Sequence, residues 1–269
     1  DKRCEANKED AQQDVAMNAI KSILVMMELE LRRLKHDRTE IYFRAIQPML
    51  WLVIYGPVMG SVKAIPTNGV PYTDYITPGV LIQSTTFVSI FYGLMMVWER
   101  DVGILKRLLV TPVPRYSVVV GRSMASGLRS LLQVFIILSV AYIIGVRFLP
   151  NPLYFVLALG VIFLSSGGFA SVSILVASFM KTRERFMGIG QAIIMPLFFA
   201  SNALYPVNLM PPILRELSII NPLTYAVDAV RGLLITGDTS KLYLDLGVLI
   251  TFDILMFILS SLSFRRIIE

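Results

Sequence analysis

Long apolar runs, separated by short charged or proline-rich breaks, dominate the pattern of the chain. A helix that crosses the hydrocarbon core of a bilayer needs about 20 mostly apolar residues. The stretches that meet this requirement are residues 41–62, 78–98, 123–146, 153–180, 187–204 and 246–264. The pattern predicts an all-α, polytopic membrane protein in which six transmembrane helices form one membrane domain over residues 41–266.

An amphipathic helix is predicted before the first span, over residues 18–40. Its apolar residues recur at steps of three and four, which places them on one helical face: Ile20, Leu24, Met27, Leu31 and Leu34. The segment is too polar to cross a bilayer, and its basic residues favour an interfacial position on the membrane. Packing on a partner protein is the alternative. Residues 1–17 are expected to form a flexible lead-in.

A charged segment, residues 98–117, lies between the second and third spans. Apolar residues fall on one helical face and charged residues fill the rest, until two prolines end the helix. The apolar residues are Ile104, Leu105, Leu108 and Leu109, and the charged ones include Glu99, Arg100, Lys106 and Arg107. We interpret the segment as a short amphipathic helix on the membrane surface; an ordinary interfacial loop is the alternative.

The distribution of positive charge predicts the orientation. Hydrophobic residues make up 55% of the chain, mean hydropathy is +0.66 and the net charge is +6. Of the 25 lysines and arginines, only five fall on one side of the predicted spans: Lys63, Arg147, Arg215, Arg231 and Lys241. Cytosolic loops carry the excess of Lys and Arg, so both termini and residues 98–117 are placed in the cytosol. The basic composition then needs no nucleic-acid partner.

The stretch between the fifth and sixth spans is amphipathic rather than fully apolar. Asn221 is suited to cap a helix that has Pro222 at its first position. The apolar residues that follow fall on one face: Leu223, Ala226, Val227, Val230 and Leu234. We predict a short helix or helical hairpin that dips into the outer leaflet.

Motifs for catalysis and for metal binding are missing from the sequence. It has no P-loop, no HExxH pair and no nucleophile elbow, and its single cysteine and single histidine, Cys4 and His36, predict no metal site. Asp253 is the exception, because it lies midway along the last span, where an ionisable group is a functional-site hypothesis. The alternative is a packing role, with hydrogen bonds from Thr251 or from a serine of a neighbouring helix.

Two stretches carry a resemblance to a known family: ERDVGILKRLLVTPVPRYSVVVGR after the second span and LYPVNLMPPILRELSIINPLTYAVDAVRGLL after the fifth. With six spans and both ends inside, residues 25–266 resemble the membrane subunits of type-two ATP-binding-cassette (ABC) exporters, such as daunorubicin-resistance and nodulation-signal export permeases.

The resemblance implies a role for each of three segments. The segment after the second span resembles the cytosolic coupling helix that contacts the ATPase: Glu99, Arg100, Asp101, Gly103, Ile104, Leu105, Lys106, Arg107 and Leu108. Residues 18–40 resemble the connecting helix beside that contact. The stretch 205–235 resembles the re-entrant outer helices, with Asn221, Pro222, Tyr225, Asp228 and Arg231.

The resemblance also implies partners and a substrate pathway. Two separate ABC ATPase subunits would bind ATP and Mg, this chain would bind no cofactor, and a second permease copy would complete the assembly in the plasma membrane. The pathway for a lipid-like, amphiphilic drug or glycan-lipid substrate would be lined by Gln83, Thr86, Ile90, Met195, Phe198, Phe199 and Asn202. The competing readings are a proton-coupled secondary transporter that uses Asp253 and a membrane-embedded enzyme that acts on lipids.

Overall fold

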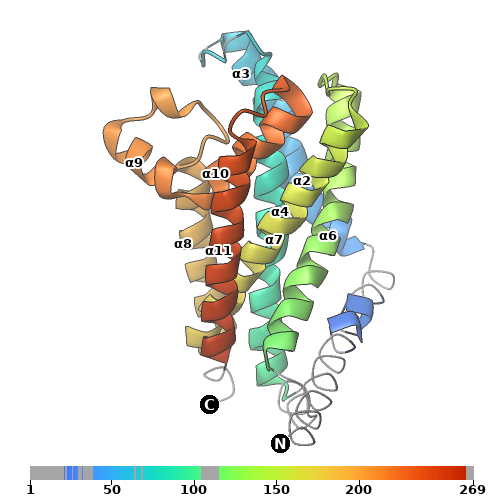
Figure 1. The fold of residues 1–269 in the computed structure, drawn as a ribbon, viewed down its shortest axis with the longest axis vertical. Coiled ribbons are helices and arrows are strands. Elements are labelled where there is room, and N and C mark those ends of the chain that lie inside the picture. Colours follow the sequence, from blue (N-terminus) through green and yellow to red (C-terminus); the bar gives the residue numbers. More distant parts are fainter. Residues whose placement is uncertain are drawn as a thin grey trace, which may run out of the picture.

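The computed structural model describes residues 39–103 except 64 and 68, residues 115–264, and residues 21, 23–25, 27–29 and 32. In this part of the chain all regular structure is helical. The long helices lie side by side in one bundle, and the chain passes back and forth between its two ends (Figure 1). This agrees with the all-α fold class expected from the apolar runs.

Five segments are long and apolar enough to cross a membrane. The first is a continuous run in which α2 (Thr39–Leu50), a π-helical turn η1 (Trp51–Tyr55) and α3 (Gly56–Val62) follow one another. The others are α4 (Tyr72–Asp101), α6 (Arg115–Ile144), α7 (Pro152–Phe179) and α11 (Leu242–Ser263).

Three of the expected spans differ clearly from the helices found. The helix α6 begins at Arg115, eight residues before the expected start of the third span at residue 123. The helix α4 begins at Tyr72, six residues before the expected start at Pro78, and it includes that proline. Where a span was expected over residues 187–204, the chain forms α8 (Arg183–Phe199), a helix of 17 residues. Such a helix is about 25 Å long, shorter than a hydrocarbon core of about 30 Å, and it is not among the five.

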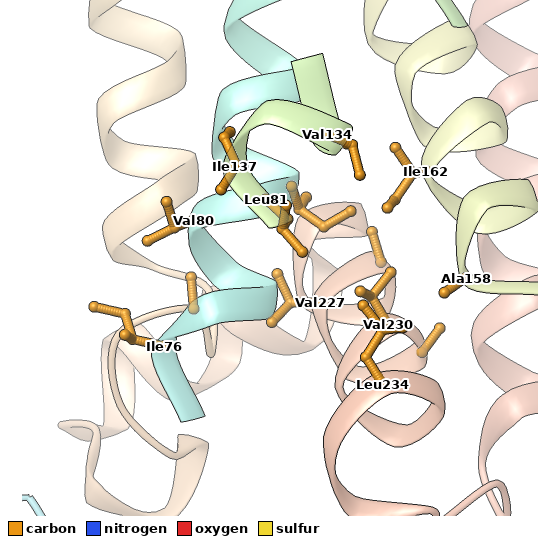
Figure 2. Packing of buried hydrophobic residues seen from close by; sticks show 14 of the residues in the cluster. Ile76, Val80, Leu81, Val134, Ile137, Ala158, Ile162, Val227, Val230 and Leu234 are labelled. Carbon is orange, nitrogen blue, oxygen red and sulfur yellow. The ribbon is translucent and has the colours of Figure 1, made fainter. Parts of the chain in front are cut away.

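The central helix of the bundle is α7, which packs against α4, α6 and α11. Near the end where α4 begins, apolar side chains from α4, α6, α7 and α10 (Pro222–Arg231) interlock in one core (Figure 2). This core includes Ile76, Val80, Leu81, Val134, Ile137, Ile162, Val227 and Val230. Burial of these side chains fixes α10 against the spans.

A group of serines joins the same helices further along. The Ser166 hydroxyl on α7 lies 2.8 Å from Ser89 Oγ on α4, and 3.1 and 2.6 Å from Ser126 Oγ and Ser130 Oγ on α6. All four side chains are buried. One hydroxyl has one donor and two acceptor positions, so the three contacts use the full capacity of Ser166.

Candidate functional site

The end of α4 that leads into residues 104–114 is held by a buried ion pair. Arg122 on α6 donates from Nη2 to Glu99 Oε2 on α4, and the two residues are 5% and 3% exposed. Arg122 belongs to the polar stripe that begins α6, and Ser126 follows it one turn later. The segment 104–114 connects α4 to α6, so the ion pair joins the two helices that this segment links.

The next two residues join α4 to the turn between α7 and α8. The Arg100 guanidinium donates to the carbonyl oxygens of Met180 and Lys181, each at 2.8 Å. The Asp101 carboxylate lies 3.3 Å from Arg183 Nε at the start of α8. Glu99, Arg100 and Asp101, which we call the junction triplet, thus contact three other helices.

The structure covers only part of the predicted coupling segment. Glu99, Arg100, Asp101 and Gly103 are described, and Gly103 has φ of +77°, a left-handed conformation that suits glycine just after a helix. Ile104, Leu105, Lys106, Arg107 and Leu108 lie outside the described residues, as do residues 1–17 and most of the side chains of 18–40.

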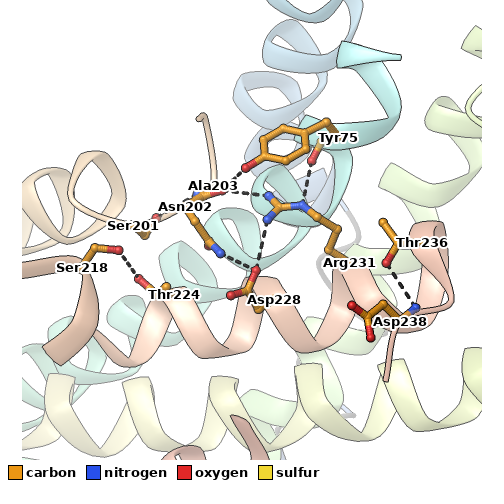
Figure 3. Close-up of polar contacts among 10 residues, drawn as sticks. All are labelled: Tyr75, Ser201, Asn202, Ala203, Ser218, Thr224, Asp228, Arg231, Thr236 and Asp238. Atoms are coloured by element: carbon orange, nitrogen blue, oxygen red, sulfur yellow. Dashed lines mark hydrogen bonds and ion pairs between the residues drawn. The ribbon is translucent and has the colours of Figure 1, made fainter. Parts of the chain in front are cut away.

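A second polar network lies at the opposite end of the bundle (Figure 3). Arg231, at the end of α10, donates from Nη2 to Asn202 O at 2.8 Å, from Nε to Tyr75 O at 3.3 Å and from Nη1 to Asp228 Oδ1 at 3.3 Å. Asn202 Nδ2 also donates to Asp228 Oδ1. We call Tyr75, Asn202, Asp228 and Arg231 the Arg231 network. It ties α10 to α4 and to the turn after α8.

Burial and ion pairing have opposite effects on the pKa values of Asp228 and Arg231. Burial raises the pKa of the Asp228 carboxyl, while the Arg231 guanidinium and the Asn202 amide lower it in part. Burial also lowers the pKa of Arg231, and the nearby Asp228 and tyrosines oppose this shift. Each of the two groups therefore favours the ionised form of the other.

The helix cap and the apolar face predicted for residues 221–234 are found in the structure. Before α10 the chain forms a short 3₁₀ turn η2 (Val207–Leu209) and α9 (Pro212–Ile220), and after it a π-helical turn η3 (Gly232–Thr236). Asn221 Oδ1 accepts from Leu223 N at 3.0 Å, with Pro222 in the first turn. The apolar face predicted for α10 is buried, and Tyr225 Oη donates to Ile219 O at 2.6 Å.

Two of the seven predicted pathway residues line the same crevice in the described part of the chain. Thr86 and Ile90 line a crevice between α4, α7 and α8 with Ile194 and Leu197. Its volume is about 20 Å³, which one water molecule would fill. Of the other five, Gln83 is buried and has no hydrogen-bond partner among the described residues, and Met195 is half-buried. Phe198 packs on Trp51, Phe199 is exposed and Asn202 belongs to the Arg231 network.

Asp253 lies on the side of α11 that faces α7. Its carboxylate rests against Gly168, where a Cβ atom would collide with Asp253 Oδ1. Oδ1 is buried and has no hydrogen-bond partner among the described residues. Thr251, the donor considered from the sequence, donates instead to Gly247 O at 2.7 Å.

Comparison with known proteins adds the family. Residues 21–235 match the model of the ABC-2 type transporter family. The chain is 27% identical over 232 residues to the transport permease ycf38 of Cyanophora paradoxa, covering 84% of this chain and 79% of the relative. It is 26% identical to the doxorubicin resistance ABC transporter permease protein DrrC of Mycobacterium tuberculosis, with 84% and 81% covered.

A third relative is nodulation protein J of Rhizobium leguminosarum bv. viciae, which is 25% identical over 81% of this chain and 84% of its own length. The family match includes both stretches from which the resemblance was drawn, as well as the junction triplet and the Arg231 network. The chain is a multi-pass membrane protein and belongs to the ABC-2 type transporter family.

Proposed function

We propose that this chain is the membrane subunit of an ATP-driven exporter, in which two copies of the permease form the pathway and two separate ABC ATPase subunits drive it. ATP and Mg bind to those ATPase subunits, and the chain itself is a transport component rather than an enzyme. Membership of the ABC-2 family supports the pairing with an ATPase.

The observation that carries this proposal is the set of contacts made by the junction triplet. A push on residues 104–114 reaches α4 and α6 together, because the buried pair Glu99–Arg122 fastens them at the base of that segment. Asp101 also contacts Arg183 at the start of α8, and Arg100 contacts the carbonyls that follow α7. Closure of the ATPase pair would therefore rock α4 and α6 together and switch access across the membrane.

The orientation and the remaining elements follow from the proposed coupling. The protein lies in the plasma membrane. Residues 99–112 and both termini face the cytosol, in keeping with the distribution of lysine and arginine. The Arg231 network then lies at the outer face, where α9 and α10 form the re-entrant segment. The chain crosses the membrane six times if α8 and the buried turn after it, residues 200–204, complete the fifth crossing.

The substrate proposed is an amphiphile: a lipid-like drug or a glycan-lipid. DrrC is named for doxorubicin resistance and nodulation protein J for nodulation, and neither name fixes a substrate for this chain. The narrow crevice at Thr86 and Ile90 is, in this proposal, the closed form of a pathway between α4 and α8 that widens when the helices rock.

Co-purification with the ATPase tests the proposal. The wild-type chain, expressed with candidate ABC ATPases and extracted in detergent, is expected to retain one of them and to stimulate its ATP hydrolysis. Leu105→Asp places a charge on the predicted apolar face of the coupling helix and is expected to abolish retention.

Ser240→Asp is the matched control. It adds the same charge at an exposed position at the other end of the bundle, and it should retain the ATPase as the wild type does. Failure of the wild type to retain any ATPase, or equal retention by Leu105→Asp in a monodisperse preparation, would contradict the proposal.

A further inference from the structure

The middle of α11 carries a carboxyl group whose charge no described residue balances. Asp253 forms no ion pair and no hydrogen bond there, and its Oδ1 atom is buried. The helix α7, on which it packs, has no charged residue. On α6, Arg122 is engaged by Glu99, and Arg129 also has an interaction of its own. A carboxyl group in such a place is costly to ionise, so it is either protonated or joined by a cation.

Asp253 lines a groove of about 280 Å³ between α6, α7 and α11. The walls are apolar and include Phe163 and Leu164 of α7 and Phe257 of α11. Ser123 and Ser171 also face the groove, but their hydroxyls lie 3.0 Å from each other and are paired. Asp253 is therefore the one ionisable group among the residues that line it.

The groove opens on the outer surface of the bundle. Met124 and Ile254, on its two rims, are 37% and 55% exposed. Only 11% of the residues in an apolar stretch of 18 residues in α11 are buried. This helix therefore presents most of its side chains outward, as a lipid-facing helix does. A ligand can thus reach Asp253 sideways from the membrane.

The depth of Asp253 selects the kind of cation. The residue is about 15 Å from either end of α11 by the helical rise, which places it near the middle of a bilayer. The ammonium of a phospholipid headgroup stays at the surface, whereas a hydrophobic amine enters the hydrocarbon region. A primary ammonium carries a positive charge and three N–H donors. It could therefore donate hydrogen bonds to the carboxylate oxygens of Asp253, which have no donor among the described residues.

We infer that this groove is a binding site for amphiphilic amines that enter from the membrane, with the ammonium on Asp253 and the apolar body along Phe163, Ile254 and Phe257. Gly168 leaves room for the carboxyl group because it has no side chain. The site is separate from the proposed pathway: Thr86 and Ile90 line a crevice on a different side of α7, with which the groove shares no residue. The inference does not depend on an ATPase.

Photolabelling of the purified chain without any ATPase tests the site. The protein is placed in phosphatidylcholine nanodiscs and exposed to dodecylamine that carries a diazirine on its chain, or to the matched dodecanol. We expect the amine to label peptides of α6, α7 or α11 that line the groove. Asp253→Asn keeps the shape of the side chain and should reduce this labelling about tenfold or more, as expected for loss of a charge-assisted hydrogen bond.

Asp245→Asn is the matched control, because it removes a carboxyl group from the same helix outside the groove and should label like the wild type. Equal labelling of Asp253→Asn and wild type, equal labelling by amine and alcohol, or labels confined to α4 and α8 would each overturn the inference. Loss of labelling on addition of phosphatidylethanolamine would also overturn it, because that result assigns the site to a lipid headgroup.

Discussion

The guanidinium carbon of Arg231 lies 3.9 Å from the centroid of the Tyr75 ring, so an arginine of α10 is stacked on an aromatic side chain of α4. The same guanidinium donates to the backbone carbonyls of Tyr75 and Asn202. The planar guanidinium of arginine can stack on an aromatic ring and donate several hydrogen bonds at once, which the ammonium of lysine cannot do. Arg231 therefore holds α10, α4 and the turn after α8 in one arrangement.

Replacing Arg231 is expected to destabilise this end of the protein. Arg231→Met removes one donor from the Tyr75 and Asn202 carbonyls and the positive charge beside the Asp228 carboxylate, at a cost of about 2–4 kcal/mol. Arg231→Lys keeps the charge and should lose less. Thermal denaturation in detergent measures both, and Arg215→Met, an arginine of α9 outside the network, is the control. Equal stability of Arg231→Met and wild type would contradict the role of the network.

The buried pair Glu99–Arg122 is expected to show strong coupling. Glu99→Gln alone leaves the buried Arg122 guanidinium without its carboxylate, at a cost of about 3–5 kcal/mol. Arg122→Gln removes the cation from beside the Glu99 carboxylate and should also destabilise the protein. The double variant removes both charges and should be more stable than either single variant. A double-mutant cycle on thermal stability gives the coupling energy, and additive losses would show that the two side chains act independently.

Gly93 is expected to tolerate no side chain, because a Cβ atom there would collide with the hydroxyl and carbonyl oxygens of Ser173 on α7. Gly93→Ala should force α4 and α7 apart and cost about 1–3 kcal/mol. Gly160→Ala, in α7, meets nothing within 4 Å and should be neutral or slightly stabilising, since alanine favours helix by about 1 kcal/mol over glycine. Equal stability of the two variants would contradict close packing at Gly93.

Ser166→Ala removes three interhelical contacts at once. Hydrogen bonds between membrane helices contribute about 0.6 kcal/mol each, so a loss of about 1–2 kcal/mol is expected in thermal denaturation. Ser139→Ala is the control, because Ser139 is exposed and bonds only to Phe135 O of its own helix. A loss no larger than that of the control would mean that the serine contacts add little to stability.

Local chemistry made α10 predictable from the sequence. The capping bond of Asn221 and the buried face from Leu223 to Leu234 depend on residues within one or two turns, and both are found. The start of α4 was not predictable in this way. Pro78 was taken as a helix start, but a proline is tolerated inside a helix whose neighbours satisfy the freed backbone group, and α4 extends to Tyr72.

Pairings between distant segments were not accessible from periodicity. The side-chain amide nitrogen and the backbone carbonyl of Asn202, a predicted pathway residue, are bonded to Asp228 and Arg231, 26 and 29 residues away. The spacing of Asp228 and Arg231 was visible in the sequence. The identity of their partners on other helices depends on how the bundle packs, which a local pattern does not contain.

The contact of Arg100 with the carbonyls of Met180 and Lys181 has one more consequence. The last turn of α7 has no basic residue of its own, although positive charge is favourable at the negative end of a helix dipole. Arg100 supplies that charge from α4. If the two helix ends separate during a transport cycle, α7 loses this favourable contact with Arg100, which disfavours the separated state.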